Sequence, residues 1–328
     1  MNKKIVLCLL SIALLSIAPA VGAQQPAKVP RIGWLTIGPL SGIAARPEAF
    51  RQGLRELGYV EGKNILIEWR GADNISERAI AQVEELVRLK VDVIVTAGSD
   101  GTRRARAATS TIPIVMASDD DPVGSGFVAS LARPGGNITG LSQLSPELSG
   151  KRLEILKEVI PKLSRVAVFG TSASVGQVHV MKEIELAAAA FGVKIQYSDV
   201  LTTKDIEPAF RAAVKGRADA VLEIIAGNIR GAARKELAEL AVKHRLPVMR
   251  ERPGHVEAGG LMSYGVNLTD LDRRAATFVD KILKGRKPTD LPVEQAMKFE
   301  FIVNLKAAKQ IGLTIPPNVL VRADKVIR

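Results

Sequence analysis

Polar side chains that could bind a ligand are concentrated in short clusters along the sequence. The cluster Ser118–Asp121 contains three consecutive aspartates. Carboxylates at Asp119 and Asp120 can bind an ammonium group or, with further ligands, a metal ion. No second acidic or histidine cluster accompanies them, and Asp121, which precedes Pro122, is typical of a turn. The cluster therefore predicts binding of a positively charged group and no metal site.

A second kind of cluster combines small residues with hydroxyl groups. Glycine lets a ligand approach the backbone closely, and hydroxyl groups both donate and accept hydrogen bonds. A helix that starts after such a cluster also directs free N–H groups toward an anion. Serine and threonine can equally cap those helices, and this alternative stays open. The predicted ligand-binding residues of this kind are Thr36, Ile37, Gly38, Ser99, Asp100, Thr171, Ser172, Ser174, Ala226 and Asn228.

Two more positions complete the predicted ligand-binding set. Glu251 can bind an ammonium group, but Arg250 and Arg252 flank it and can neutralise it instead. Tyr264 can stack on a ligand, with packing at a hinge as the alternative. Acidic clusters and anion-binding clusters together predict an amino-acid-like zwitterion or a small carboxylate as the ligand.

Sequence motifs of catalysis are absent. The chain has no G-x-S-x-G, G-x-x-x-x-G-K-[ST], H-E-x-x-H or G-x-G-x-x-G motif. Its single cysteine is Cys8, and its histidines are His179, His244 and His255, which lie far apart in the sequence. A thiolate nucleophile and a clustered zinc site are therefore not expected. We predict a protein that is not an enzyme and has no cofactor.

The elements that must position these clusters alternate between strand and helix. Ile32–Ile37 is a nearly continuous apolar run, typical of a strand covered on both faces. Phe50, Leu54 and Leu57 then form a helical stripe, and Gly58 lies where a helix ends. Further strands are predicted at 64–69, 91–96 and 113–117, with helices at 76–88, where Ser76 can cap, and from about 102.

The same pattern restarts at Arg165, 134 residues after Arg31. Strands are predicted at 166–169, 193–197, 218–225 and 246–249, with helices through 181–191, 205–214 and 230–244. Such alternation predicts right-handed parallel βαβ units. The predicted fold is α/β, with two doubly wound, Rossmann-like parallel-sheet lobes joined by a multi-strand hinge. We assign 29–142 and about 264–290 to lobe one, and 146–262 and about 293–328 to lobe two.

Ligands of open parallel sheets bind outside the carboxyl ends of the strands. Each cluster described above follows a predicted strand, so two facing lobes would gather the clusters around one cleft. Tyr264 would lie in a segment that crosses between the lobes. The predicted fold therefore implies a ligand held between two hinged lobes.

The amino-terminal residues predict export. Lys3 and Lys4 precede an apolar run, and Val21-Gly22-Ala23 ends the segment with small residues, as a cleaved signal peptide does. We assign residues 1–23 to that signal and the protein to the periplasm. Without Lys3 and Lys4, the chain has 44 basic and 34 acidic residues, a net charge of +10. The basic residues are dispersed and aromatics make up only 4% of the chain, so we predict no nucleic-acid binding.

Several sequence strings resemble the ABC transporter substrate-binding family, in the branch with tryptophan- and phenylalanine-binding members. The most specific is Val128–Gly140, with the sequence VASLARPGGNITG. The others are Ile112–Val115, Asp121–Gly124, Lys243–Pro247, Glu257–Gly265, Asp280–Gly285 and Gly312–Pro317. The resemblance implies a periplasmic-binding-protein type I fold with three crossings and uptake of a small solute. It also implies a monomer that delivers this solute to an inner-membrane ABC permease.

The chain departs from the family pattern in two places. Gly170–Ser174 stands where relatives often carry an asparagine-rich loop, and the triple aspartate is unusually acidic. The solute of the aromatic-amino-acid members therefore does not transfer to this chain. An extracytoplasmic ligand-sensing subunit of a membrane receptor is the alternative function. A DNA-binding repressor of the same fold is disfavoured by the export signal, and a hydrolase or isomerase is a remote alternative.

Overall fold

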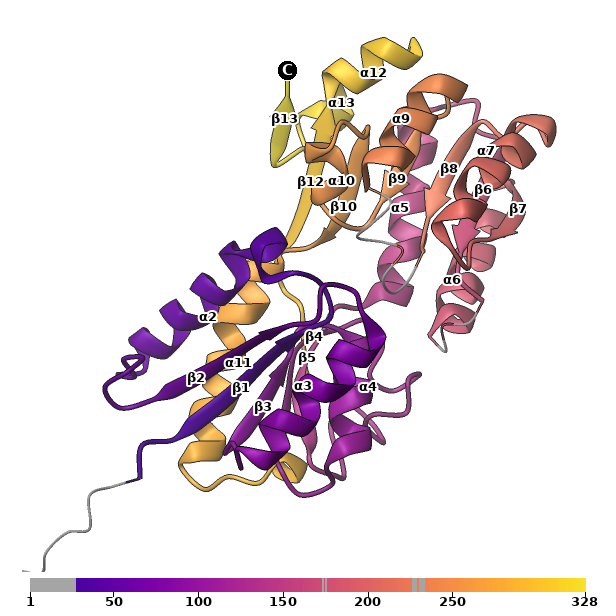
Figure 1. Cartoon of the computed structure of the whole chain (residues 1–328). Coiled ribbons are helices and arrows are strands. Elements are labelled where there is room, and N and C mark those ends of the chain that lie inside the picture. Colours follow the sequence, from indigo (N-terminus) through magenta and orange to yellow (C-terminus); the bar gives the residue numbers. More distant parts are fainter. Residues whose placement is uncertain (1–27, 173, 175, 226–228, 230–233) are drawn as a thin grey trace, which may run out of the picture.

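The computed structural model describes residues 28–172, 174, 176–225, 229 and 234–328, so the predicted signal peptide lies outside the described residues. These residues form two α/β lobes, each built on its own sheet (Figure 1). Two sheets of mainly parallel strands confirm the predicted fold class. Among the described residues, no helix is both long and apolar enough to cross a membrane.

The sheet of the first lobe has six strands in the order β11-β5-β4-β3-β1-β2, all paired in parallel. Alternate residues of its strands point to opposite faces, which explains why Val93 and Val95 join one apolar cluster and Ile94 another. The strands are β1 (Arg31–Thr36), β2 (Leu66–Gly71), β3 (Val93–Thr96), β4 (Ile114–Asp119), β5 (Ile138–Ser142) and β11 (Glu294–Gln295).

Helices cover both faces of this first sheet. Phe50 and Leu54 of α2 join the same cluster as Val93, together with Leu271 of α11, and Figure 1 shows these two helices side by side. Leu86 and Ala105 belong to the cluster on the opposite face. The helices are η1 (Leu40–Ile43), α2 (Ala45–Glu56), α3 (Ser76–Arg88), α4 (Ser99–Ala108), α11 (Leu268–Leu283) and η3 (Pro288–Asp290).

The sheet of the second lobe has seven strands in the order β13-β12-β10-β9-β8-β6-β7. All its neighbouring strands pair in parallel except β10 and β12, which are antiparallel. The strands are β6 (Arg165–Gly170), β7 (Lys194–Asp199), β8 (Ala220–Glu223), β9 (Val248–Arg250), β10 (Met262–Val266), β12 (Phe299–Asn304) and β13 (Lys325–Ile327).

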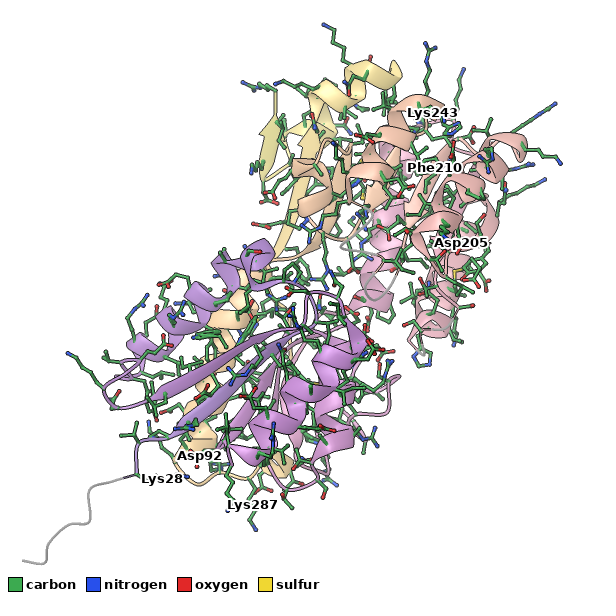
Figure 2. All side chains as sticks on the ribbon, viewed as in Figure 1. Lys28, Asp92, Asp205, Phe210, Lys243 and Lys287 are labelled. Carbon is green, nitrogen blue, oxygen red and sulfur yellow. The ribbon has the colours of Figure 1, made fainter. Side chains whose placement is uncertain are left out.

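Apolar clusters on both faces hold the second lobe together. On one face lies Phe210, which is labelled in Figure 2. It packs edge-on against Phe169 at 5.1 Å and stacks on His244 at 5.7 Å between ring centroids. The helices are α5 (Ser145–Val159), α6 (Gln177–Phe191), η2 (Thr203–Asp205), α7 (Ile206–Lys215), α9 (Arg234–His244), α10 (Gly254–Glu257), α12 (Leu305–Ile311) and α13 (Pro317–Leu320).

The chain passes between the lobes more than once. It leaves the first sheet after β5 and enters α5, returns from β10 to α11, and goes back from β11 to β12. The lobe boundaries remain a proposal. The strand pairings favour limits slightly different from those predicted, because β10 runs to Val266 in the second sheet and β11 at Glu294 joins the first.

The local differences from the sequence predictions have simple causes. Ser76 is the first residue of α3 and not its cap, and its hydroxyl group accepts a hydrogen bond from Arg104 at 3.0 Å. Helix α4 already begins at Ser99, and α6 begins only at Gln177, five residues after Ser172. Strand β5 and helix α5 were not predicted. Gly192 ends α6 at a φ of 64°, as predicted.

Candidate functional site

A cavity of about 580 Å³ lies between the two lobes at the carboxyl ends of their strands. The first lobe lines it with the segments that follow β1, β3 and β4. The second lobe contributes residues near the start of α6 and the segment that follows β9. This is the position at which open α/β sheets bind ligands.

Nine of the predicted residues line this cavity. Seven come from the segments that follow β1, β3 and β4 in the first lobe, and two come from the second lobe. They are Thr36, Ile37, Gly38, Ser99, Asp100, Asp120, Asp121, Ser174 and Glu251. Ala226 and Asn228 lie outside the described residues.

Five predicted residues do not line the cavity. Ser118 accepts a hydrogen bond from Arg46 Nη2 at 2.9 Å. Thr171 donates to the carbonyl oxygen of Val200 at 3.1 Å, and it lines a second, more open hollow between the lobes. The backbone N–H and hydroxyl groups of Ser172 both donate to Asp199, at 2.8 and 2.5 Å. These side chains have structural partners instead of facing the cavity.

Asp119 and Tyr264 are the other two predicted residues that do not line the cavity. The ring of Tyr264 stacks on Phe299 at 6.2 Å and meets Phe301 edge-on at 6.3 Å. Its carbonyl oxygen accepts a hydrogen bond from Arg152 Nε at 2.8 Å. This geometry corresponds to the packing alternative for Tyr264.

The carboxyl group of Asp119 is completely buried at the end of β4. Burial, together with the charge of neighbouring Asp120, raises its pKa to about 8, although hydroxyl groups of Ser99 and Thr102 oppose the shift. Asp119 therefore carries a proton at neutral pH. The triple aspartate does not present three negative charges to a ligand.

We expect Asp119→Asn to flatten the dependence of stability on pH. The pKa of Asp119 is about 8 in the folded protein and about 4 in an unfolded chain, so the folded state holds the extra proton between these values. The free energy of unfolding then falls as pH rises from about 4 to 8, by up to about 1.4 kcal/mol per pH unit. Asparagine does not titrate and removes this contribution.

Urea denaturation between pH 5 and 8 measures that slope. Asp290→Asn, at an exposed position in η3, should keep the wild-type profile. Equal slopes for wild type and Asp119→Asn would show that Asp119 is ionised in the folded protein.

Two aspartates of the acidic cluster contact the opposite lobe. Asp121 Oδ2 lies 2.7 Å from His179 Nδ1 of α6, and Asp120 Oδ1 lies 3.7 Å from Arg252 Nη2. Arg252 Nη2 also donates to Gln143 at 3.4 Å. These contacts join the lobes beside the cavity, a role that the sequence prediction of an ammonium site did not include.

Three buried arginines in the cavity wall were missed by the sequence analysis. Arg46 Nε bonds Asp272 of α11 at 2.5 Å. Arg250 forms an ion pair with Glu223, in which both side chains are almost completely buried. Burial lowers the pKa of Arg250 to about 10, so the side chain stays charged at neutral pH. Arg250 follows a predicted strand, which was a usable signal, whereas Arg46 looks like a surface residue of an amphipathic helix.

The third is Arg152 of α5, whose Nη1 donates to Ser149 at 3.0 Å and whose Nη2 lies 3.8 Å from Glu251. Glu251 also accepts a bond from Arg252 Nε at 3.0 Å, so its predicted neutralisation by a flanking arginine is observed. Arg252 is the arginine that neutralises Glu251, whereas Arg250 forms its ion pair with Glu223.

The described part of the cavity wall carries both signs of charge in equal number. Its six arginines are Arg46, Arg103, Arg152, Arg234, Arg250 and Arg252, and its six acidic residues are Asp100, Asp120, Asp121, Glu251, Glu257 and Glu300. Within the described ranges, no three His, Cys, Asp or Glu side chains form a group that could hold a metal ion. Such a wall can pair with a solute that carries charges of its own.

Comparisons with known proteins agree with this architecture. The family model described as "ABC transporter substrate binding protein" matches residues 41–327. A tyrosine-binding protein of Clostridioides difficile (strain R20291) is 27% identical over 267 residues, which are 81% of this chain and 76% of that protein.

Two solved structures are similar in fold to this chain. A conserved domain protein from Vibrio cholerae has a TM-score of 0.84 at 29% identity, covering 91% of this chain and all of its own. An ABC domain in complex with L-Trp from Streptococcus pneumonia has a TM-score of 0.83 at 24% identity, covering 91% and 99%. These likenesses confirm the predicted periplasmic-binding-protein type I fold.

Proposed function

Because the chain belongs to the ABC transporter substrate-binding protein family, we propose that it is the periplasmic receptor of an ABC importer. In this proposal it captures an amino-acid-like zwitterion or a small carboxylate between its lobes and delivers it, unaltered, to an inner-membrane permease. The apolar leader at residues 1–23 supports export, and the relatives that bind tyrosine and L-Trp support an amino-acid-like solute.

The observation that carries the proposal is the cavity between the lobes with its balanced charges. The first turn of α4 lines it at Ser99, where the backbone N–H groups of a helix start favour a carboxylate. Glu251 and Asp120 offer carboxylates for an ammonium group. A zwitterion uses both kinds of partner at once.

Closure of the lobes on the solute follows from contacts that both lobes make. A ligand favours the closed form only by the difference between its affinities for the closed and open forms. A solute that touches Ser99 in the first lobe and Glu251 in the second gains its full set of contacts only when the lobes are together. The chain segments that cross between the lobes supply the hinge.

A thermal unfolding screen tests the proposed function. The protein is first unfolded and refolded to remove any solute retained during purification, and it is then heated with amino acids, small carboxylates, sugars and simple cations. We expect at least one zwitterion or carboxylate to stabilise the fold, by about 2.7 kcal/mol at a concentration 100 times its Kd. Stabilisation by sugars or cations alone would contradict the proposal.

A further inference from the structure

No phenylalanine, tyrosine or tryptophan lines the described part of the cavity. The two tryptophans, three tyrosines and eight phenylalanines of the chain all lie in the described residues, so each ring can be placed. Trp34 and Phe50 lie in the core of the first lobe, and Phe169 and Phe210 in the core of the second. Tyr264 packs against Phe299 and Phe301 at the sheet of the second lobe. An aromatic solute would find no phenylalanine, tyrosine or tryptophan ring to stack on.

The cavity wall also carries charged groups, which a large apolar side chain would have to separate from water. An aromatic side chain gains affinity by burying about 150–250 Å² of its surface against apolar groups. Here it would press against guanidinium and carboxylate groups and remove water from them without replacing their hydrogen bonds, which is unfavourable. A small solute that brings its own charged groups avoids this penalty.

Two of the cavity arginines form ion pairs with carboxylates that do not line the cavity. Arg46 lines the cavity, while its partner Asp272 is completely buried and lies outside the lining. Arg250 and its buried partner Glu223 show the same arrangement in the second lobe. Each carboxylate fixes the direction of a guanidinium group. Asp272 takes the Nε and Nη2 side of Arg46, so Nη1 is the side that a solute carboxylate can approach.

Arg152 stands beside Arg250 in the wall contributed by the second lobe. Its side chain is only 2% exposed, and it is held by Ser149 and by the carbonyl oxygen of Tyr264. Its Nη2 also forms an ion pair with the carboxylate of Glu251 at 3.8 Å. The cavity therefore has fixed, buried guanidinium groups in both lobes.

Building on the proposed function, we propose that the solute is a small, non-aromatic molecule with two carboxylate groups. Arg46 of the first lobe binds one carboxylate, and Arg152 and Arg250 of the second lobe bind the other. A solute anchored at both ends favours the closed form, because only that form satisfies both ends. An ammonium group on the same molecule would pair with Asp120 or Glu251, so the solute is either a plain dicarboxylate or an acidic amino acid.

Calorimetric titration of the refolded protein tests this inference. The probes are succinate, glutarate, L-glutamate, the monocarboxylate butyrate, L-tyrosine and L-tryptophan. We expect a dicarboxylate or L-glutamate to bind at least tenfold more tightly than butyrate, L-tyrosine and L-tryptophan. Preference for L-glutamate over glutarate identifies an acidic amino acid, and the reverse identifies a plain dicarboxylate. Failure of all three dicarboxylate probes to bind overturns the inference.

Substitutions of Arg46 add a second readout. Arg46→Lys keeps a positive charge against Asp272 and loses the fork, and we expect about tenfold to hundredfold weaker binding of the best probe. Arg55→Gln, on the exposed side of the same helix, should leave binding unchanged. Circular dichroism establishes that both variants are folded. A folded Arg46→Lys with wild-type affinity overturns the assignment of Arg46.

The two proposals fail in different ways. If L-tyrosine or L-tryptophan binds more tightly than every dicarboxylate, the inference about the solute is wrong and the proposed receptor function stands. If sugars or cations bind and no amino acid or carboxylate does, both proposals are wrong.

Discussion

Glu223→Gln should lower the free energy of unfolding by about 3–5 kcal/mol, because it removes the carboxylate that pairs with a buried guanidinium group. Glu223 is 2% exposed and lies outside the cavity lining, so water has little access to the side of Arg250 that loses its contact. Glutamine keeps an oxygen for the backbone N–H of Ile225, which bonds Glu223 Oε1 at 2.7 Å. The loss of unfolding free energy therefore measures the ion pair between Glu223 and Arg250, and not a change in side-chain shape.

Urea denaturation measures this change, and two further variants serve as comparisons. Glu56→Gln breaks an exposed ion pair with Arg273 at 2.9 Å and should cost no more than about 1 kcal/mol. Replacing both Glu223 and Arg250 with methionine removes the two buried charges together and should recover most of the lost stability. A Glu223→Gln variant as stable as Glu56→Gln would mean that Arg250 is stabilised by other groups.

Gly140→Ala should be as damaging, with an expected loss of about 2–6 kcal/mol of unfolding free energy. Gly140 has a φ of 132°, a conformation that other residues adopt only under strain. A Cβ at this position would lie 2.2 Å from the carbonyl oxygen of Met116 on the neighbouring strand. Because the obstacle is backbone, β4 and β5 would have to separate.

Strand β4, the neighbour that Gly140 of β5 approaches, also positions part of the cavity wall. The pairing of β4 with β5 shifts in register between Met116 and Asp119, just before the acidic cluster. We therefore expect weaker solute binding as well as lower stability in Gly140→Ala. Gly136→Ala is the matched control, because its Cβ would meet no atom within 4 Å. Equal urea midpoints for the two variants would contradict this prediction.

The strand ends of the first lobe could be predicted from sequence because their signals are local. Apolar runs followed by small polar residues indicated the segments at Thr36, Ser99 and Asp120, and all three line the cavity. The restart of the pattern at Arg165 indicated the second lobe, whose first strand begins at that residue. These patterns need no knowledge of distant residues.

Helix α5 was missed because it is buried on more than one face, with Leu153, Ile155 and Leu156 all inside the lobe. A helix covered in this way lacks the single apolar stripe that sequence analysis detects. Ser145 followed by Pro146 was the usable signal, since proline favours the first turn of a helix.

The buried ion pairs could not be predicted because their partners are distant in sequence. Arg46 and Asp272 are 226 residues apart, and neither stands in a recognisable motif. Only the packing of α2 against α11 brings them together. Likewise, the proton on Asp119 depends on complete burial, which the sequence of an acidic cluster does not reveal.

The packing of α11 on α2 has a consequence for the order in which the protein matures. Phe50 and Leu54 are covered by a helix that is synthesised only after most of the second lobe, and β11 joins the first sheet later still. The amino-terminal lobe is therefore completed on the ribosome only after most of the second lobe has been made, and a nascent chain that ends before residue 268 carries an uncovered apolar surface. Such delayed completion suits the proposed export, because a polypeptide is threaded across a membrane before it becomes compact.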